Sequence, residues 1–481
     1  MLIESLSKVI ILLPILPATL VSKVLFFVTI TTLLLKTYPF LESPLTKSIT
    51  STVVLSLTKP LISFLLSPFC KNETYAFSLL SIKSILGLNI SGFLFIKVLL
   101  ITILYDKRIK KLKKDNTNNM KTNKSFIYIL IIFFIISINS IYSFTTFLTK
   151  ETYSLVIRQS LFYLIGIIII LILLKIKPEK VLKYAQVFYI VNIILLILVL
   201  LIGNEVNGTK AWFNIPLIGT FQPSEFMKIG LILMLSKVID SQKIKTIKDE
   251  ILLITKVLII TIIPSIVTFL EPDTGAVLIY FLIAFVMLFI SKLRIRWFVI
   301  LFTIIIALVS LLFYTYIFQT DTFIKIFGNS MFYRFDRIFD WQSSSGMQLE
   351  NSLISIGSSN YFGKGISNIL LYFPEGHTDF IFSAFASIYG LTGMIILITT
   401  IIWFDVTIIK TNTKNKAYKY IIGGTIGALL YQQIQNISMT IGLLPITGIT
   451  LPFISYGGSS LLSYMILLGI IMSIKKETIQ N

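Results

Sequence analysis

Long apolar segments separated by short polar ones follow one another from about residue 126 to the last residues of the chain. Each apolar segment is hydrophobic on every helical face and is too long for a barrel strand, so we predict membrane-spanning α-helices, which need roughly 20 apolar residues each. Ten such spans are predicted, over 126–148, 155–174, 184–202, 222–238, 251–270, 274–291, 297–318, 380–404, 419–437 and 459–474. The expected fold class is an all-α polytopic membrane protein with a ten-span helical core.

Lysine and arginine are distributed unevenly among the connections between these spans. The connections on one side carry 26 basic residues, and those on the other side carry 6. Basic residues are enriched in cytoplasmic loops, so the first set is predicted to face the cytoplasm. The long connection 319–379, between spans seven and eight, is then predicted to face outward.

The residues before the first of these spans form an apolar N-terminal extension. Apolar runs near 9–35, 50–68 and 87–105 predict two or three further spans within residues 1–105. Segment 106–125 is polar, basic and rich in asparagine, which predicts a cytoplasmic linker, with contact to anionic lipid as the alternative. The expected domains are therefore an extension over 1–105, a linker over 106–125 and a ten-span core over 126–481.

Composition supports a membrane protein and excludes several other classes. Of the 481 residues, 55% are apolar and 13% are charged, whereas soluble proteins carry roughly 25% charged residues. The net charge of +20 does not indicate a nucleic-acid partner, because the basic residues lie in loops between apolar spans. The single cysteine, Cys70, excludes an internal disulfide framework.

Polar residues concentrate in four clusters, all in connections predicted to face outward, and the first cluster is 207–228. In this cluster Pro223 suits the first turn of a helix, and Glu225 suits the positive end of the helix dipole. Lys228 follows one turn later on the same face as Glu225. The pattern predicts a capped helix start with an internal ion pair, and a substrate-binding role remains open.

The second and fourth clusters are a tight acidic turn and an uncharged loop. Glu271 and Asp273 could bind a cation, hold a nearby basic residue or cap the next helix, and capping is favoured. Segment 442–460 has four glycines, two prolines and no charge. Irregular backbone at membrane depth survives only where it is buried in protein or lines a cavity, so a structural hinge and a substrate-lining loop are both open.

The third cluster is the connection 319–379, which is long enough to fold over a site. Loops of this length are usually functional. His377, the only histidine of the chain, lies between Glu375 and Asp379. Asp379 also precedes a predicted membrane helix, so it is either an N-cap or a carboxylate held at the membrane surface as a general base.

Several chemistries are disfavoured by what the sequence lacks. It has no GxxxxGK[ST] phosphate loop for ATP hydrolysis, too few soft ligands for a zinc site, and no GxSxG elbow for a serine triad. Carboxylates, lysines and arginines beside lipid remain. This inventory suits an anionic amphiphile whose head group carries phosphate, because cations hold phosphate and a carboxylate moves a proton.

The motifs GTKAW, QPSEFMK, EPDTG, FPEGHTDFIF and LLPITGITLPFISYGGSS together resemble the SEDS family of rod-shape, division and sporulation proteins. The resemblance covers roughly 126–481 and includes the order of the motifs. It implies a peptidoglycan glycosyltransferase in the cytoplasmic membrane, with its active site on the extracytoplasmic side. Such an enzyme polymerises lipid II, the undecaprenyl-pyrophosphate disaccharide-peptide, for cell elongation or division, alongside a class B penicillin-binding protein.

The resemblance and the polar residues of the outward connections together indicate the site residues, with Arg334, Arg337 and His377 taken from the long connection alone. The family's catalytic aspartate matches Asp379, which would accept the proton of the acceptor sugar's 4-hydroxyl. The cations expected to stabilise the leaving pyrophosphate, alone or with a Mg²⁺ or Mn²⁺ ion, are Lys210, Lys228, Arg334, Arg337 and Lys364. The other residues expected at the substrate are Trp212, Gln222, Glu225, Glu271, Asp273, Glu375, His377, Ser455, Gly457, Gly458 and Ser459.

Two other functions compete with polymerisation. A flippase would move the lipid-linked precursor without joining it, but transporters usually place ionisable groups near the bilayer midplane, whereas the acids here lie towards the outer edge. A non-catalytic scaffold for a penicillin-binding protein would tolerate the loss of Asp379. Assays with lipid II on the outer side, and of Asp379→Asn, distinguish these alternatives.

Overall fold

The computed structural model describes residues 118–146, 152–206, 209–215, 219–339, 346–366 and 371–480. The predicted extension over 1–105 lies outside the described residues, and so does most of the predicted linker 106–125. Residues 118–125 belong to the first described helix, α6 (Asn118–Thr146).

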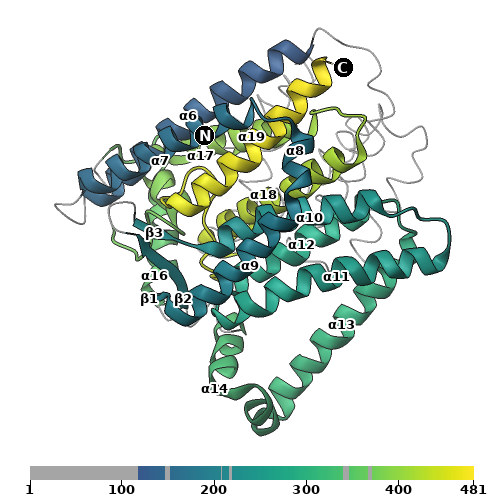
Figure 1. Cartoon of the computed structure of the whole chain (residues 1–481). Helices are drawn as coiled ribbons and strands as arrows, with labels where there is room; N and C mark the ends of the chain where they lie inside the picture. The colour runs from purple at the N-terminus through teal and green to yellow at the C-terminus, as the bar shows by residue number, and fades with distance from the viewer. Residues whose placement is uncertain are drawn as a thin grey trace, which may run out of the picture. The chain divides into compact units, whose positions relative to one another are not determined.

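A helix occupies each of the ten segments predicted to span the membrane (Figure 1). Besides α6, they are α7 (Thr152–Leu173), α9 (Ala185–Ile202), α10 (Pro223–Ser241), α11 (Ile247–Leu270), α12 (Thr274–Ile290), α13 (Ile295–Phe318), α17 (Ile381–Ile409), α18 (Lys416–Thr440) and α19 (Gly458–Gln480). Among the described residues, seven helices are long and apolar enough to cross a membrane, and α12 is a shorter apolar helix. The helical multi-pass architecture is confirmed, and the count of ten crossings stays a prediction.

The two remaining helices, α10 and α18, are more polar because they lie inside the bundle. Helix α10 packs against α9, α12, α18 and α19, and α18 packs against α12 and α17. Most residues of both helices are buried. The short helix α8 (Pro178–Lys183) connects α7 to α9. A helix that is surrounded by other helices does not contact lipid and can therefore carry more polar residues. The low hydropathy of α10 and α18 is consistent with their position inside the bundle.

The connection 203–221, which the sequence analysis leaves as a loop, contains a small antiparallel sheet. Its strands are β1 (Asn204–Val206), β2 (Thr209–Ile215) and β3 (Gly219–Phe221), in the order β1-β2-β3, with Phe213 opposite Phe221. The all-α prediction missed these strands. The sequence does carry their signal, since Asn207-Gly208 is a strong hairpin dipeptide and β2 is rich in β-branched and aromatic residues.

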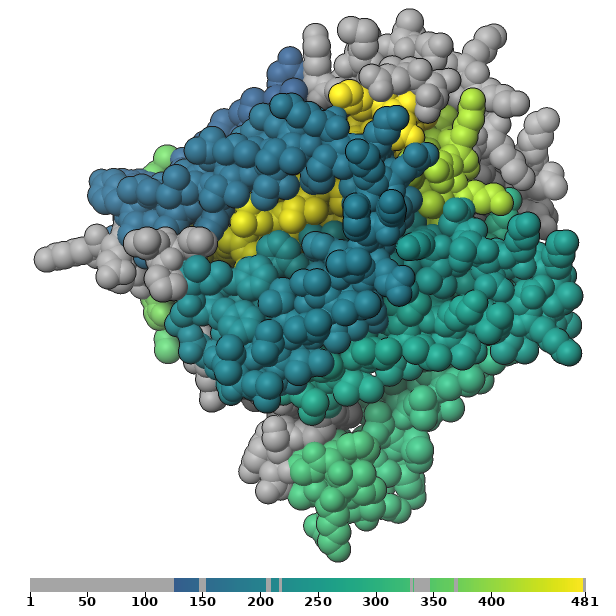
Figure 2. Space-filling model, in the orientation of Figure 1, coloured from purple at the N-terminus to yellow at the C-terminus, as the bar shows by residue number. Residues whose placement is uncertain are grey.

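The long connection 319–379 is partly helical. It contains α14 (Thr320–Phe339), which is interrupted at Gly328, and α16 (Gly346–Gly357). Helix α14 packs against α13, and α16 packs against α17. Along α13 only Phe298 is buried, and α13 and α14, drawn in green, project from the other helices (Figure 2).

Residues 441–457, which connect α18 to α19, fold back into the bundle and are called the re-entrant loop here. Ser137 of α6 donates to the carbonyl of Ile454 at 2.7 Å, and Gln159 of α7 donates to that of Ser455 at 3.2 Å. Ser137 precedes the end of α6 by nine residues, or about 13 Å of helix. Residues 451–455 are buried, and the side chains of Tyr163, Ser137 and Gln159 donate to the carbonyls of Phe453, Ile454 and Ser455. Irregular backbone at this depth needs such partners.

Candidate active site

All four polar clusters meet at one end of the bundle. Three of them are carried by loops, and the remaining one is the acidic turn that opens α12. The side-chain amide of Asn436 in α18 donates to the carbonyls of Asp379 and of Ile449 in the re-entrant loop, at 2.7 Å each. Gln222 donates through its side chain to Asp273 at 3.1 Å and through its backbone N–H to Ser459 at 2.9 Å. Segments far apart in the sequence therefore build one polar site.

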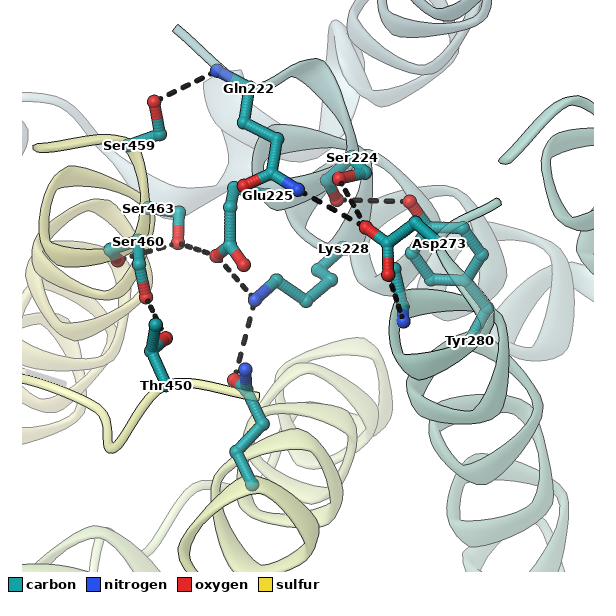
Figure 3. Close-up of polar contacts among 12 residues, drawn as sticks. Gln222, Ser224, Glu225, Lys228, Asp273, Tyr280, Thr450, Ser459, Ser460 and Ser463 are labelled. Carbon is teal, nitrogen blue, oxygen red and sulfur yellow. Dashed lines mark hydrogen bonds and ion pairs between the residues drawn. The ribbon is translucent and has the colours of Figure 1, made fainter. Parts of the chain in front are cut away.

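The start of α10 carries a buried ion pair, as the sequence predicted. Pro223 lies in the first turn, and the Lys228 ammonium contacts the Glu225 carboxylate at 2.5 Å (Figure 3). Lys228 is 1% exposed, also donates to Gln432 at 3.3 Å, and lies 4.8 Å from the ring centre of Tyr464. The Lys228 charge is therefore fully engaged within the protein.

Asp273 caps α12, which confirms the favoured interpretation of the acidic turn. Its carboxylate accepts hydrogen bonds from the backbone N–H of Ala276 at 3.0 Å, from Gln222 at 3.1 Å and from Ser224 at 3.2 Å (Figure 3). Burial nevertheless raises the pKa of Asp273, and the nearby Glu225 adds to the effect. Asp273 therefore has a structural role as a helix cap, and its charge also raises the pKa of Asp379.

Glu271 differs from its neighbour Asp273 because, in the described part of the chain, no group donates a hydrogen bond to its carboxyl. It is fully buried, and neither of its carboxyl oxygens has a hydrogen-bond partner among the described residues. Burial, with a contribution from Asp273, raises the pKa of Glu271 to about 9. The side chain is therefore a neutral acid at pH 7 and has no surface that a substrate could touch.

Asp379 is held by its backbone, while its carboxylate is left free. The N-cap alternative is wrong, because Phe380 occupies the cap position of α17 and no side chain caps the helix. Among the described residues, no group donates a hydrogen bond to the Asp379 carboxylate, which is half-buried. Burial raises its pKa to about 7, with contributions from the charges of Glu375 and Asp273. A half-buried carboxylate with this pKa is suited to accept a proton near neutral pH.

The helix that follows Asp379 is broken after its first turns. Gly390 has φ 62° and ψ −158°, which divides α17 into a short segment, 381–389, and a longer one, 391–409. Residues 360–365 of the long connection pair with the break: Lys364 N–H donates to Ser387 at 2.8 Å, and Leu391 N–H donates to Asn360 at 3.0 Å. These bonds replace helical bonds lost at the break and fix the short segment next to Asp379.

The remaining predicted residues of the FPEGHTDF segment surround Asp379. The Glu375 carboxylate accepts a hydrogen bond from Thr378 at 2.5 Å. His377 is half-buried between the rings of Phe144 and Tyr456, with ring centres 6.3 and 5.7 Å away. Burial lowers the pKa of His377, so this histidine is neutral at pH 7.

Other predicted site residues have mostly structural contacts. The Ser455 hydroxyl donates to the carbonyl of Thr378 at 2.6 Å and accepts from Leu451 N–H at 2.8 Å. Ser459 contacts Gln222 as given above, and a Cβ on Gly458 would lie 2.6 Å from the Phe162 ring. The backbone N–H of Gly457 approaches the Gln159 amide oxygen at 3.4 Å.

The predicted cations are spread over different elements. Lys210 lies in β2, where Trp212 also lies, and donates to the carbonyl of Leu201 at 3.0 Å. Lys364 is half-buried beside the break in α17. Arg334 and Arg337 lie on α14, and their side chains are outside the described part of the chain. Within that part, no group of three or more acidic, histidine or cysteine side chains lies close enough together to hold a metal ion.

Several polar residues near the site were not predicted because they lie inside helices. Asn436, Gln432 and Gln159 are all buried and hydrogen-bonded to the site or to the re-entrant loop. Asp405 also lies inside a helix and accepts from Gln433 at 3.1 Å, because α17 extends to Ile409 and not to 404. Polar residues within apolar spans are a functional signal in their own right, and this signal would have found them.

Comparisons with known proteins agree with this architecture. The model of a cell cycle protein family named for FtsW, RodA and SpoVE matches residues 120–480. The probable peptidoglycan glycosyltransferase FtsW of Buchnera aphidicola subsp. Schizaphis graminum is 30% identical over 345 residues, which cover 69% of this chain and 93% of that protein. The FtsW of Coxiella burnetii is 33% identical over 286 residues, covering 58% of this chain and 74% of that protein.

Solved structures share the fold. A chain of a structure described as "Structural coordination of polymerization and crosslinking by a peptidoglycan synthase complex" aligns with a TM-score of 0.59 and 24% identity, over 74% of this chain and 98% of that one. The rod shape determining protein RodA of Thermus thermophilus aligns with a TM-score of 0.54 and 24% identity, over 74% and 97%. The resemblance to SEDS proteins is thereby confirmed, and the chain belongs to the FtsW/RodA/SpoVE family of cell cycle proteins.

Proposed function

We propose that this chain is a peptidoglycan glycosyltransferase that polymerises lipid II on the extracytoplasmic side of the membrane, with Asp379 as its general base. The relatives from Buchnera aphidicola and Coxiella burnetii are each named "Probable peptidoglycan glycosyltransferase FtsW". The observation that carries the proposal is that no described residue donates to the Asp379 carboxylate, whereas the carbonyls of His377, Thr378 and Asp379 are all hydrogen-bonded. Burial raises the pKa of this carboxylate to about 7.

In the proposed reaction the 4-hydroxyl oxygen of the acceptor sugar attacks the anomeric carbon of the donor. Asp379 takes the hydroxyl proton as the new glycosidic bond forms and the bond to pyrophosphate breaks. Fixed cations stabilise the charge that grows on the departing pyrophosphate. Lys228 is buried and bound to Glu225, so we assign that task to Lys364, Lys210, Arg334 and Arg337, with Lys228 offsetting the acids at the base of the site.

A crosslinking partner follows from the chemistry of the product. A polymerase releases uncrosslinked glycan strands, so it needs a transpeptidase to act on them. The solved complex with the same fold is described as one that coordinates polymerisation with crosslinking. We therefore propose a class B penicillin-binding protein as the partner of this chain.

The test is polymerisation of labelled lipid II by the purified protein, supplied with its partner, in liposomes that receive the substrate from the outside. General acid–base catalysis contributes about 10²–10⁴-fold, so Asp379→Asn is expected to lose that much rate. Asp321→Asn, which changes an exposed acid of the same connection, serves as the matched control. Wild-type rates for a folded Asp379→Asn protein would reject the role of Asp379, and an absence of polymer from the wild type would favour a flippase or a scaffold.

A further inference from the structure

Three consecutive carbonyl groups around Asp379 are each bound by a different donor. The carbonyl of His377 accepts from the backbone N–H of Tyr456 at 2.9 Å, and that of Thr378 accepts from the Ser455 hydroxyl at 2.6 Å. The carbonyl of Asp379 itself accepts from the side-chain amide of Asn436 at 2.7 Å. Two of the donors belong to the re-entrant loop, and the third belongs to α18.

Asn436 differs from the other two donors because it lies in α18, outside the re-entrant loop, and binds both that loop and Asp379. Its amide nitrogen has two protons, and the second is donated to the carbonyl of Ile449 at 2.7 Å. Asn436 is fully buried, so both protons of its amide find their acceptors within the protein. Two carbonyls that converge on one buried side chain need a neutral group with two donors, which a side-chain amide supplies.

We propose that Asn436 is the positioning residue for Asp379: its amide ties the backbone of the catalytic aspartate to the re-entrant loop and so fixes where the carboxylate meets the acceptor sugar. This inference rests on the proposed function of Asp379. Asn436 does not touch the reacting atoms. It acts through the backbone of Asp379, whose carboxylate accepts no hydrogen bond from the described residues.

The neighbouring residue Gln435 offers a matched control. It is also buried in α18, and its amide donates to the carbonyl of Pro445 in the same re-entrant loop at 3.0 Å. It has no bond to residues 377–379. Loss of Gln435 therefore loosens the loop without releasing the Asp379 backbone.

The experiment measures kcat, KM and the pH profile of lipid II polymerisation for Asn436→Leu, Gln435→Ala and Asp379→Asn. A catalytic group misplaced by about 1 Å costs about 10²-fold in rate. Asn436→Leu is therefore expected to lose about that factor in kcat with KM nearly unchanged. The acidic limb of its pH profile should also move to lower pH, because a loosened carboxylate is better hydrated and lies farther from Glu375 and Asp273. Gln435→Ala should keep kcat within about threefold, as an effect confined to loop packing predicts.

Each outcome decides between the alternatives. A folded Asn436→Leu protein with wild-type kcat and an unmoved pH limb overturns the inference, and so does an equal loss in Gln435→Ala. If Asn436→Leu does not fold, Asn436→Thr, which keeps one donor, decides in its place, with wild-type kcat again overturning the inference. If Asp379→Asn polymerises normally, the proposed function fails; if only Asp379→Asn is inactive, the positioning role alone fails.

Discussion

Two acidic segments at the same end of the bundle use their carboxylates in opposite ways. In the turn 271–273, Asp273 is bound by three donors and Glu271 is sealed in the protein. In the segment 375–379, the backbone is bound on three successive carbonyls, while the Asp379 carboxylate has no donor among the described residues. A carboxylate that is partly exposed and makes no structural hydrogen bond is available for chemistry. This contrast supports Asp379 as the general base more strongly than its charge alone does.

Replacing Asp379 or Asp273 by asparagine should give the largest difference in reaction rate between the two segments. Asp379→Asn removes the base and is expected to lower the rate by about 10²–10⁴-fold. Asp273→Asn keeps a good helix cap and is expected to keep most of the rate at pH 8. The measurement is the initial rate of polymer formation for both variants. Equal losses would contradict the contrast.

The break in α17 gives the next largest effect. A Cβ at Gly390 would lie 2.4 Å from the backbone N of Gly363 and 2.7 Å from the carbonyl oxygen of Asn360, and its positive φ is unfavourable for alanine. Gly390→Ala should therefore displace the segment 381–389 and lower kcat by about 10²-fold. Steady-state kinetics on protein that remains monodisperse in detergent test this, and an unchanged kcat would mean that the break does not position Asp379.

The charge of Asp273 should be visible in the pH dependence of the wild-type reaction. Asp273 helps to raise the pKa of Asp379, so its removal lowers that pKa. In Asp273→Asn the acidic limb of kcat/KM is expected to move to lower pH, and activity at pH 6 should rise relative to activity at pH 8. An unmoved limb in the pH profile would show that the two acids do not interact.

Glu271 should affect the stability of the folded protein and not the pH dependence of the reaction rate. Its pKa is raised from an ordinary value near 4.5 to about 9 in the folded protein, so folded protein binds the proton more tightly than unfolded protein. Its stabilising effect is complete below pH 4.5 and is lost as the pH rises towards 9. Thermal unfolding of Glu271→Gln should consequently lose less Tm between pH 6 and pH 9 than the wild type loses, and parallel curves would contradict this.

The sequence predicted the helices well because a lipid-facing helix must be apolar over its whole length. Each of the ten segments is helical, and the ion pair of Glu225 with Lys228 and the cap formed by Asp273 follow from spacing within one turn. These features depend on contacts between residues close together in the chain, which can be predicted from their spacing in the sequence.

Features that depend on distant contacts were harder to predict. The binding of the Asp379 carbonyl by Asn436 joins residues 57 positions apart, and the break at Gly390 is stabilised by residues 360–365 of a different element. The N-cap alternative for Asp379 failed because the chain turns from Glu375 to Phe380, where Phe380 N–H donates to the Glu375 carbonyl at 2.9 Å, and Phe380 becomes the cap residue of α17. The roles of the predicted cations likewise depend on tertiary contacts, as the buried Lys228 shows.

The pH profile of kcat/KM for lipid II polymerisation tests the central claim most directly. If Asp379 is the base, the rate rises with pH through a single limb centred near pH 7, because only the carboxylate form accepts the proton. Asp379→Asn should lower the whole profile and abolish this limb. A limb of the same midpoint in a folded Asp379→Asn protein would show that another group is the base and would contradict the account.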